Sequence, residues 1–459
     1  MKPRISCVRN KAVLLAAVMA FTLSSRPAMG RATLPAPAPF TVSLKKATAQ
    51  PAPALQSFAF GQSGGKWLLI GGRTNGFHRT STQESTFPTK YSNEHIYVVD
   101  PVNDKTWSVG LPAQYRQQLR VSNMQFYQDG NTLYFLGGYA STCDDDKPSC
   151  YQTYPNLAAI NVPQMINDII AGNDVSRDIV SITDDRFRVT GGALRKLGDY
   201  FYLVCGQNYN SIYKGAVEGI YTDQIARFKI QLSGGTLAIT DYFTYLYQNS
   251  TGPDSQYHRR DLNVVEAIRS DGSEGITVYG GVFTKTGGPW RNPIYIDQNS
   301  GGGVRIIVDS SFEQKMSLYE CGHVAMFDPS TKTMYTTLLG GISDYYYDSQ
   351  GQLQPSNLDN PLPFINSIST EARLADGSTQ ETPQPPSQSL PELLGANGVF
   401  VPASNVALLA GHVIDYSRLP KGTTMVGYFY GGILATAAQS GVFNPTYAEQ
   451  TIFEVYVTK

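Results

Sequence analysis

The stretch Trp67-Leu-Leu-Ile-Gly-Gly72, an apolar strand that ends in two glycines, returns in near copies along the chain of 459 residues. Its second glycines stand 60 to 91 residues apart. A repeat of this period indicates one supersecondary unit stacked several times, because a single unit cannot bury its own apolar faces. The glycines suit strand ends where the backbone needs a positive φ or a close approach. The other copies are Leu133-Tyr-Phe-Leu-Gly-Gly138, Phe201-Tyr-Leu-Val-Cys-Gly206, Ile276-Thr-Val-Tyr-Gly-Gly281, Tyr335-Thr-Thr-Leu-Leu-Gly-Gly341 and Gly427-Tyr-Phe-Tyr-Gly-Gly432.

Within the first repeat, the residue pattern predicts four antiparallel strands, over 55–61, 66–72, 94–100 and 105–109. The segment Ile96-Tyr-Val-Val-Asp-Pro101, followed by Trp107, Leu111-Pro112 and Arg116, resembles the kelch motif. The resemblance implies an all-β, kelch-type β-propeller with one four-stranded blade per repeat. The diglycines carry it over six repeats, whereas the Asp-Pro and Trp part is intact only in the first. The resemblance is specific for the fold and indicates almost nothing about function.

The two ends of the chain complement each other. The last repeat supplies strands over 425–432 and 451–457 and then stops one strand short, whereas residues 40–44 form a strand without a repeat of its own. We therefore expect residues 40–44 to complete the last blade, so that the N- and C-terminal strands pair and close a ring of six blades. The long interval before Gly432 leaves a degenerate seventh blade as the alternative.

The first thirty residues have the features of a secretory signal peptide. Lys2, Arg4, Arg9 and Lys11 precede an apolar run over 12–23, and small residues allow cleavage after Gly30. We expect residues 1–30 to be removed and residues 31–459 to form one exported propeller domain, periplasmic or secreted. An uncleaved membrane anchor is the alternative, and no later segment is apolar enough to span a membrane.

Net charge and cysteine content restrict the class of partner and the cellular compartment. Signal removal takes away five basic residues and no acidic one, which moves the formal net charge from −1 to −6. This balance argues against a nucleic-acid partner, which requires a basic face. Cys143 and Cys150 close a short loop and are expected to form a disulfide in an oxidising compartment. Cys205 and Cys321 are expected to be small buried apolar residues.

Long loops predict a binding face. In each repeat the turn between the first two strands is short, whereas the segment after the diglycine is long. These long segments share one face of a propeller, around the mouth of its central channel, where binding and catalysis usually occur. The alternative is that they only cover the ring. Polar and aromatic side chains there suit a glycan or a protein ligand, and we expect contacts from His78, Arg116, Arg186, Tyr209, Arg259, Trp290, Tyr345 and Tyr346.

Two functions from different classes remain. The first is a monomeric binding module for a glycan or a protein partner at the loop-rich face. The alternative is an enzyme acting on a sugar or glycan, of the epimerase, mutarotase or lyase type. It would use His258, Arg260, Glu320 and His323, converging at the channel mouth, for acid–base catalysis. The sequence favours binding because it contains no recognised catalytic motif. For any one of these residues, packing beneath a loop or an ion-pair network is the structural alternative.

No metal or cofactor is expected. The five histidines show no metal-ligand spacing. The run Asp144-Asp145-Asp146 lacks the spacing of a calcium loop and is interpreted as a solvated acidic turn. Galactose oxidase shares the kelch fold and binds copper through tyrosine and histidine. Residues of the required types occur here, but none matches that motif by position: Tyr257, Tyr319, Cys321 and His323.

Overall fold

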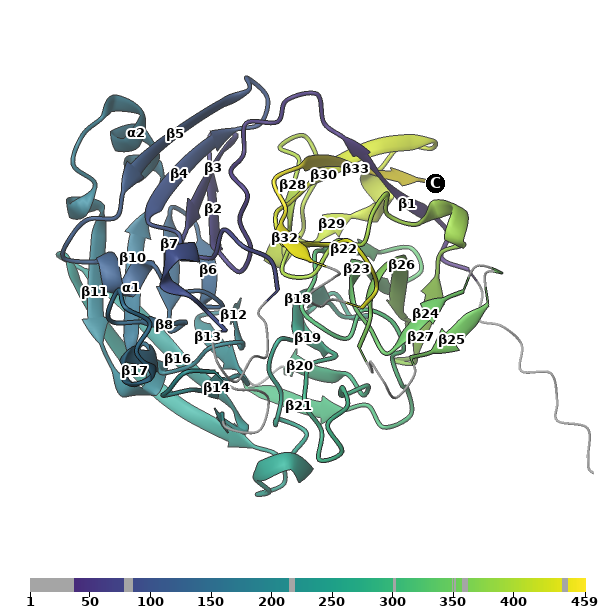
Figure 1. The fold of residues 1–459 in the computed structure, drawn as a ribbon. Helices are drawn as coiled ribbons and strands as arrows, with labels where there is room; N and C mark the ends of the chain where they lie inside the picture. Colours follow the sequence, from purple (N-terminus) through teal and green to yellow (C-terminus); the bar gives the residue numbers. More distant parts are fainter. Residues whose placement is uncertain are drawn as a thin grey trace, which may run out of the picture. The chain divides into compact units, whose positions relative to one another are not determined.

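Antiparallel sheets follow one another along the chain and surround a common centre (Figure 1). The computed structural model describes residues 37–77, 86–213, 219–299, 303–348, 350, 352–356, 362–439 and 445–459. Within these residues there are six blade sheets, so the protein is a six-bladed β-propeller, as the repeat predicts. The expected signal segment, residues 1–30, lies outside the described residues.

Each blade is described from its first strand to its fourth. The first two blades are β2 (Ala59–Ser63), β3 (Lys66–Ile70), β4 (His95–Asp100) and β5 (Lys105–Gly110), then β6 (Gln125–Asp129), β7 (Thr132–Leu136), β10 (Asn156–Asn161) and β11 (Ile179–Thr183). The next two are β12 (Ala193–Leu197), β13 (Tyr200–Val204), β16 (Gln224–Ser233) and β17 (Thr236–Leu246), then β18 (Asn263–Ile268), β19 (Glu274–Tyr279), β20 (Ile294–Gln298) and β21 (Val304–Val308). The last two are β22 (His323–Asp328), β23 (Thr333–Ile342), β26 (Phe364–Arg373) and β27 (Thr379–Pro383), then β28 (Val399–Pro402), β30 (Thr423–Tyr430), β33 (Ile452–Thr458) and β1 (Thr41–Lys46).

The two ends of the chain close the ring, which confirms the prediction for residues 40–44. β1 pairs antiparallel with β33, with Val42 opposite Val457 and Leu44 opposite Val455. In Figure 1 the purple N-terminal strand lies beside the yellow C-terminal strands. The interval before Gly432 contains the β26–β27 hairpin and β28, so the described residues contain no seventh blade. The first predicted strand is shorter than expected, since β2 begins at Ala59.

Four short hairpins distinguish the two faces of the ring. Each stands between the second and third strands of its blade, so all four lie on one face, which we call the loop face. The other face carries the connections between first and second strands, and we call it the turn face. The hairpins are β8 (Tyr139–Ser141) with β9 (Tyr151–Thr153), β14 (Gln207–Asn208) with β15 (Ile220–Tyr221), β24 (Tyr345–Tyr347) with β25 (Leu353–Pro355), and β31 (Ile433–Ala435) with β32 (Thr446–Ala448).

The diglycines are needed for the backbone geometry that the sequence predicts. Gly71 and Gly72 have φ values of 69° and 83°. A Cβ on Gly72 would lie 2.5 Å from the carbonyl oxygen of Gln56. In the third copy Cys205 replaces the first glycine but keeps the left-handed φ, at 56°. This conformation costs a residue with a Cβ about 1–2 kcal/mol.

The hydrophobic core lies between neighbouring blades. Leu68 of the first blade packs with Phe135 of the second, and α2 (Val162–Ala171) adds Met165 to this cluster. Every blade therefore buries its faces against its neighbours. Two further predictions are confirmed: Cys143 is bonded to Cys150, and Cys205 and Cys321 are buried free thiols. Within the described residues, no helix has both the length and the apolar character needed to cross a membrane.

Candidate functional site

A ring of hydrogen bonds constricts the central channel near the loop face. Each blade contributes one residue, which lies just before its first strand. From the second blade to the sixth, the backbone N–H of this residue donates to the carbonyl oxygen of the corresponding residue in the preceding blade, over 2.7 to 3.1 Å. Asn397 Nδ2 donates to Ser57 Oγ at 2.8 Å and completes the circle. We call these the ring residues: Ser57, Asn123, Gly191, Asp261, Glu320 and Asn397.

Side-chain hydrogen bonds also join members of this ring. Asn123 Nδ2 donates to Asp261 Oδ1 at 2.7 Å. The bond passes Gly191, where a Cβ would lie 3.0 Å from the same carboxylate oxygen. Adjacent backbone segments in such a circle stand about 5 Å apart, so six of them leave little open space once side chains point inward. The ring residues therefore narrow the channel on its loop-face side.

On the turn-face side of the ring, the channel holds a cavity of about 300 Å³. The first strands of all six blades contribute to its walls, so these strands are the inner ones. The aromatic side chains come from the sixth, first and second blades, and the charged ones from the third, fourth and fifth. The lining includes Phe60, Gln62, Phe126, Tyr127, Arg195, Glu266, Glu320, His323, Phe400 and His412.

Four ionisable side chains from three neighbouring blades meet in this cavity, and we call them the cavity cluster: Arg195 of β12, Glu266 of β18, Glu320 before β22 and His323 of β22. Arg195 Nε lies 3.3 Å from Glu266 Oε1. Burial and the nearby Asp261 carboxylate raise the pKa of Glu320 to about 7, although Arg195 opposes this. Burial and Arg195 lower the pKa of His323 to about 4. At pH 7 the imidazole is therefore neutral, and Glu320 populates both of its forms.

The structure brings together two of the four residues expected to be catalytic. Glu320 and His323 line the cavity, whereas His258 and Arg260 are absent from its described lining. Arg260 Nε donates to Tyr221 Oη at 3.1 Å, and Arg260 also pairs with Asp261. His258 Nδ1 lies 2.6 Å from Asp223 Oδ1, and its ring stacks on Tyr221 with centroids 3.8 Å apart. These two residues lie before the first strand of the fourth blade.

Three of the expected ligand contacts are buried. Arg259 is 0% exposed and donates to the carbonyl oxygens of Gly280 and Asn292, both at 2.9 Å. Burial lowers its pKa to about 10. Trp290 Nε1 donates to the His258 carbonyl oxygen at 2.7 Å. We call this group the tyrosine–arginine layer: Tyr213, Tyr221, His258, Arg259, Arg260 and Trp290. Tyr209, the third of the buried contacts, packs in an aromatic cluster with Tyr139, Tyr151 and Tyr213.

The other expected contacts are more exposed. Arg116 pairs with Glu94 at 2.8 Å, and Arg186 pairs with Asp184 at 2.5 Å. The Arg291 guanidinium lies 5.5 Å from the ring centroid of Tyr345. Tyr346 is 38% exposed, and His78 lies outside the described residues. Ligand contact by all these residues stays a prediction.

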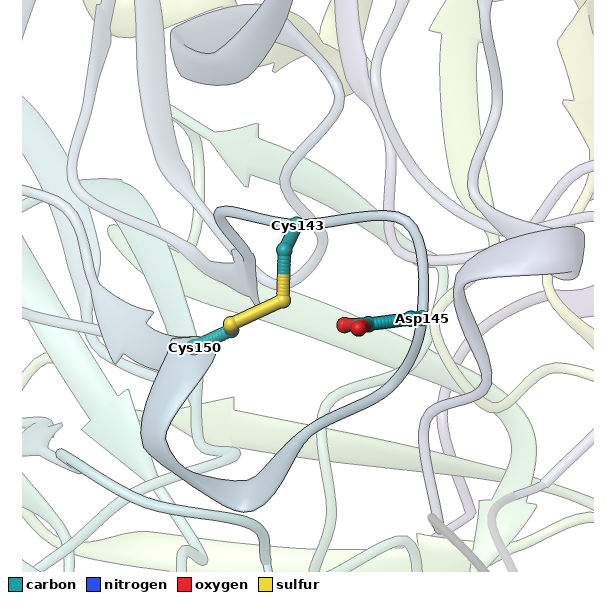
Figure 2. A group of neighbouring side chains, drawn as sticks. All are labelled: Cys143, Asp145 and Cys150. Atoms are coloured by element: carbon teal, nitrogen blue, oxygen red, sulfur yellow. A yellow bond between two sulfur atoms is a disulfide. The ribbon is translucent and has the colours of Figure 1, made fainter.

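The acidic turn lies inside the disulfide loop. Figure 2 shows the bonded sulfurs of Cys143 and Cys150 with the Asp145 carboxylate directed toward them. Their ligand atoms lie close enough for a metal site, but the disulfide occupies both sulfurs. All three carboxylates have a partner within the protein. Asp144 pairs with Arg120 at 2.7 Å, Asp145 pairs with Lys147 at 2.5 Å, and Asp146 accepts a hydrogen bond from Tyr151 at 2.6 Å.

Sequence reasoning missed most of the cavity lining, including Arg195, Glu266 and His412. Arg195 and Glu266 lie within first strands, where alternation alone predicts packing against a neighbouring blade. His412 comes from a long connection, residues 403–422, that joins β28 to β30 on the turn face. A charged residue inside a first strand could have indicated the cavity, because the other residues of such strands are mostly apolar or uncharged.

The comparisons with known proteins found similar solved structures but no match in sequence. No protein-family model matches the chain, and no curated protein matches it in sequence. Kelch membership therefore stays a prediction. Among solved structures, one reported as "Structure of YjhT" is similar, with 11% identity and a TM-score of 0.46, over 88% of this chain and 99% of that chain. We draw no conclusion from a similarity of this degree.

Proposed function

We propose that the protein binds a small neutral carbohydrate in its central cavity and that Glu320 transfers a proton there. The supporting observation is the convergence of Glu320, His323, Arg195 and Glu266 on one cavity, with the pKa of Glu320 raised to about 7. Perturbed ionisable groups gathered in a cavity are typical of functional sites. The proposal therefore favours the enzyme, which the sequence analysis gives as the alternative, over a binding module at the loop face.

The walls of the cavity suit a sugar. Its volume of about 300 Å³ is at the lower end of small-molecule sites. Phe60, Phe126 and Phe400 offer apolar surfaces for the C–H faces of a sugar ring, and the cavity cluster offers partners for its hydroxyls. The Arg195 guanidinium is already paired with Glu266, so this charge is less available to an anion. A neutral sugar therefore fits better than an acidic one.

Mutarotation or epimerisation of a sugar is the reaction class that this cluster supports. When a cyclic hemiacetal opens, one group takes the proton of the anomeric hydroxyl, the ring C–O bond breaks, and another group protonates the ring oxygen. Closure reverses these transfers. A carboxyl with a pKa near 7 can take or give a proton at neutral pH. Neutral His323 can hold a hydroxyl by a hydrogen bond.

The binding module is retained as a second candidate. Tyr345 and the exposed Tyr346 lie in the β24–β25 hairpin of the loop face, beside the Arg291 guanidinium. An aromatic and arginine surface of this kind suits a protein or glycan partner. Export after loss of residues 1–30 belongs to both candidates, and the Cys143–Cys150 disulfide supports it.

The test uses residues 31–459 and a panel of neutral aldoses and ketoses. A sugar at one hundred times its dissociation constant should stabilise the protein by about 2.7 kcal/mol, measured as a melting shift. Anomer exchange of that sugar, followed by saturation-transfer NMR, should be accelerated. Glu320→Gln should retain the melting shift and slow the exchange by about 10² to 10⁴.

The matched control is Glu313→Gln, because Glu313 is exposed on the loop after β21. This variant should behave like the wild type in both assays. A melting shift without any acceleration would support a binding role alone. The absence of both effects across the panel would overturn the proposal.

A further inference from the structure

We infer that a ligand reaches the cavity from the turn face, past His412, and not from the loop face with its long aromatic loops. The inference concerns access to the site of the proposed function and rests on it for the identity of the ligand. The geometry of the access route itself is independent of that identity.

The loop-face side of the cavity is narrowed by two sets of contacts. The ring residues come first, with the Asn123–Asp261 hydrogen bond running past Gly191 on one side of the ring. The tyrosine–arginine layer covers the Asp261 side of this ring: Arg260 is 6% exposed and bonds Tyr213 Oη at 2.9 Å in addition to Tyr221. A ligand that passes the Asp261 side of the ring from this face would have to break both sets of contacts.

The turn-face side is open to solvent. Among the lining residues, Gly130 of the β6–β7 turn and His412 of the 403–422 connection are exposed. Lining residues at the ring end, such as Gly192 and Gly322, are buried. The cavity therefore meets solvent where the first strands end, beneath the turns.

The 403–422 connection places His412 at this opening. The other connections between first and second strands are short, for example 64–65 and 130–131, whereas this one contains β29 (Ile414–Asp415), which pairs in parallel with β22 of the fifth blade. A Cβ on Gly411 would lie 2.8 Å from Cβ of Glu266 in the fourth blade. The His412 ring lies 6.4 Å from the ring of Tyr127 in the second blade. His412 thus stands over the cavity, between blades of the propeller.

The test measures access with a chemical probe and needs no sugar. His323→Cys places a thiol inside the cavity, and (2-aminoethyl) methanethiosulfonate is the reagent. The thiolate attacks the thiosulfonate sulfur, a disulfide to the aminoethylthio group forms, and methanesulfinate leaves. Fragment-ion mass spectrometry gives the labelling rate at position 323 separately from that of Cys321 on the same peptide, with the buried thiol of Cys205 as a reference in the same molecule.

Two second-site variants partly block the turn-face opening. His412→Trp should slow labelling about tenfold, a change of about 1.4 kcal/mol in activation free energy. Gln62→Trp, near the turn-face end of β2 in the cavity lining, should act in the same direction and covers the case that the left-handed φ of 59° at position 412 rejects tryptophan. Lys285→Trp, on the exposed β19–β20 loop of the loop face, is the control and should leave the rate unchanged.

Unchanged labelling in both blocked variants, with native melting temperatures, would overturn the inference. Slower labelling with Lys285→Trp but not with the two blocked variants would place the access on the loop face and overturn it as well. A confirmed route with no sugar bound would reject the proposed function alone. The two failures are therefore distinguishable.

Discussion

The tyrosine–arginine layer and the cavity cluster both hold buried charge, but they satisfy it differently. In the layer, Arg259 and Arg260 direct their hydrogen bonds to carbonyl oxygens, to tyrosine hydroxyls and to Asp261. In the cavity cluster, Glu320 and His323 turn toward an open volume. Charge that is fully paired inside the protein stabilises a conformation, whereas charge that faces a cavity is available to a ligand. The difference predicts stability effects for the first region and pH-dependent effects for the second.

The largest effect is expected in the layer. Arg260→Met leaves the Asp261 carboxylate buried without its cation, which should cost about 3–5 kcal/mol of unfolding free energy in urea titrations. The control is Arg186→Met, since Arg186 is half-exposed and pairs with Asp184 on the surface. That variant should lose no more than about 1 kcal/mol. Equal small losses in both variants would remove the distinction between the two regions.

An intermediate effect is expected in the cavity cluster, with a dependence on pH. The folded-state pKa of Glu320, about 7, lies above its unfolded value, so the folded state binds more protons between about pH 4.5 and 7. The contribution of Glu320 to stability should therefore fall by about 2 kcal/mol across this window as the pH rises, whereas that of His323, with its pKa lowered to about 4, rises with pH. Glu320→Gln cannot titrate and should lack this loss, as shown by urea titrations at pH 5 and pH 8. Parallel pH profiles of wild type and variant would contradict the burial of this charge.

The smallest effect is expected for His258, which the sequence groups with the catalytic candidates and the structure places in the layer. His258→Ala removes the Asp223 hydrogen bond and the stacking on Tyr221, which should cost about 1 kcal/mol in stability. Sugar affinity, measured by calorimetry, should be unchanged. A loss of affinity with unchanged stability would assign His258 to the site and not to the layer.

Position within a repeat selects two residues that line the cavity and two that lie in the tyrosine–arginine layer. Glu320 and His323 stand at the start of the fifth repeat, where the sequence predicts a place close to the channel. The same argument selects His258 and Arg260 at the start of the fourth repeat. In the structure Arg260 pairs with Asp261, and Glu320 is the member of its blade that enters the ring of hydrogen bonds. A shift of one position along the chain changes the side of the ring on which a side chain lies. A repeat pattern does not locate residues to within one position.

The sequence by itself determined the architecture of this protein. A diglycine at each strand end, an unpaired strand at the start and a missing strand at the end predicted six blades and their closure, because these features depend on local backbone geometry and on apolar periodicity. Only the tertiary structure decided which polar side chains meet. Successive members of the set Arg195, Glu266 and Glu320 are 71 and 54 residues apart along the chain. They become neighbours because the curvature of the ring brings the first strands of different blades to one axis, and the hydrogen bonds that constrict the channel determine the face to which the cavity opens.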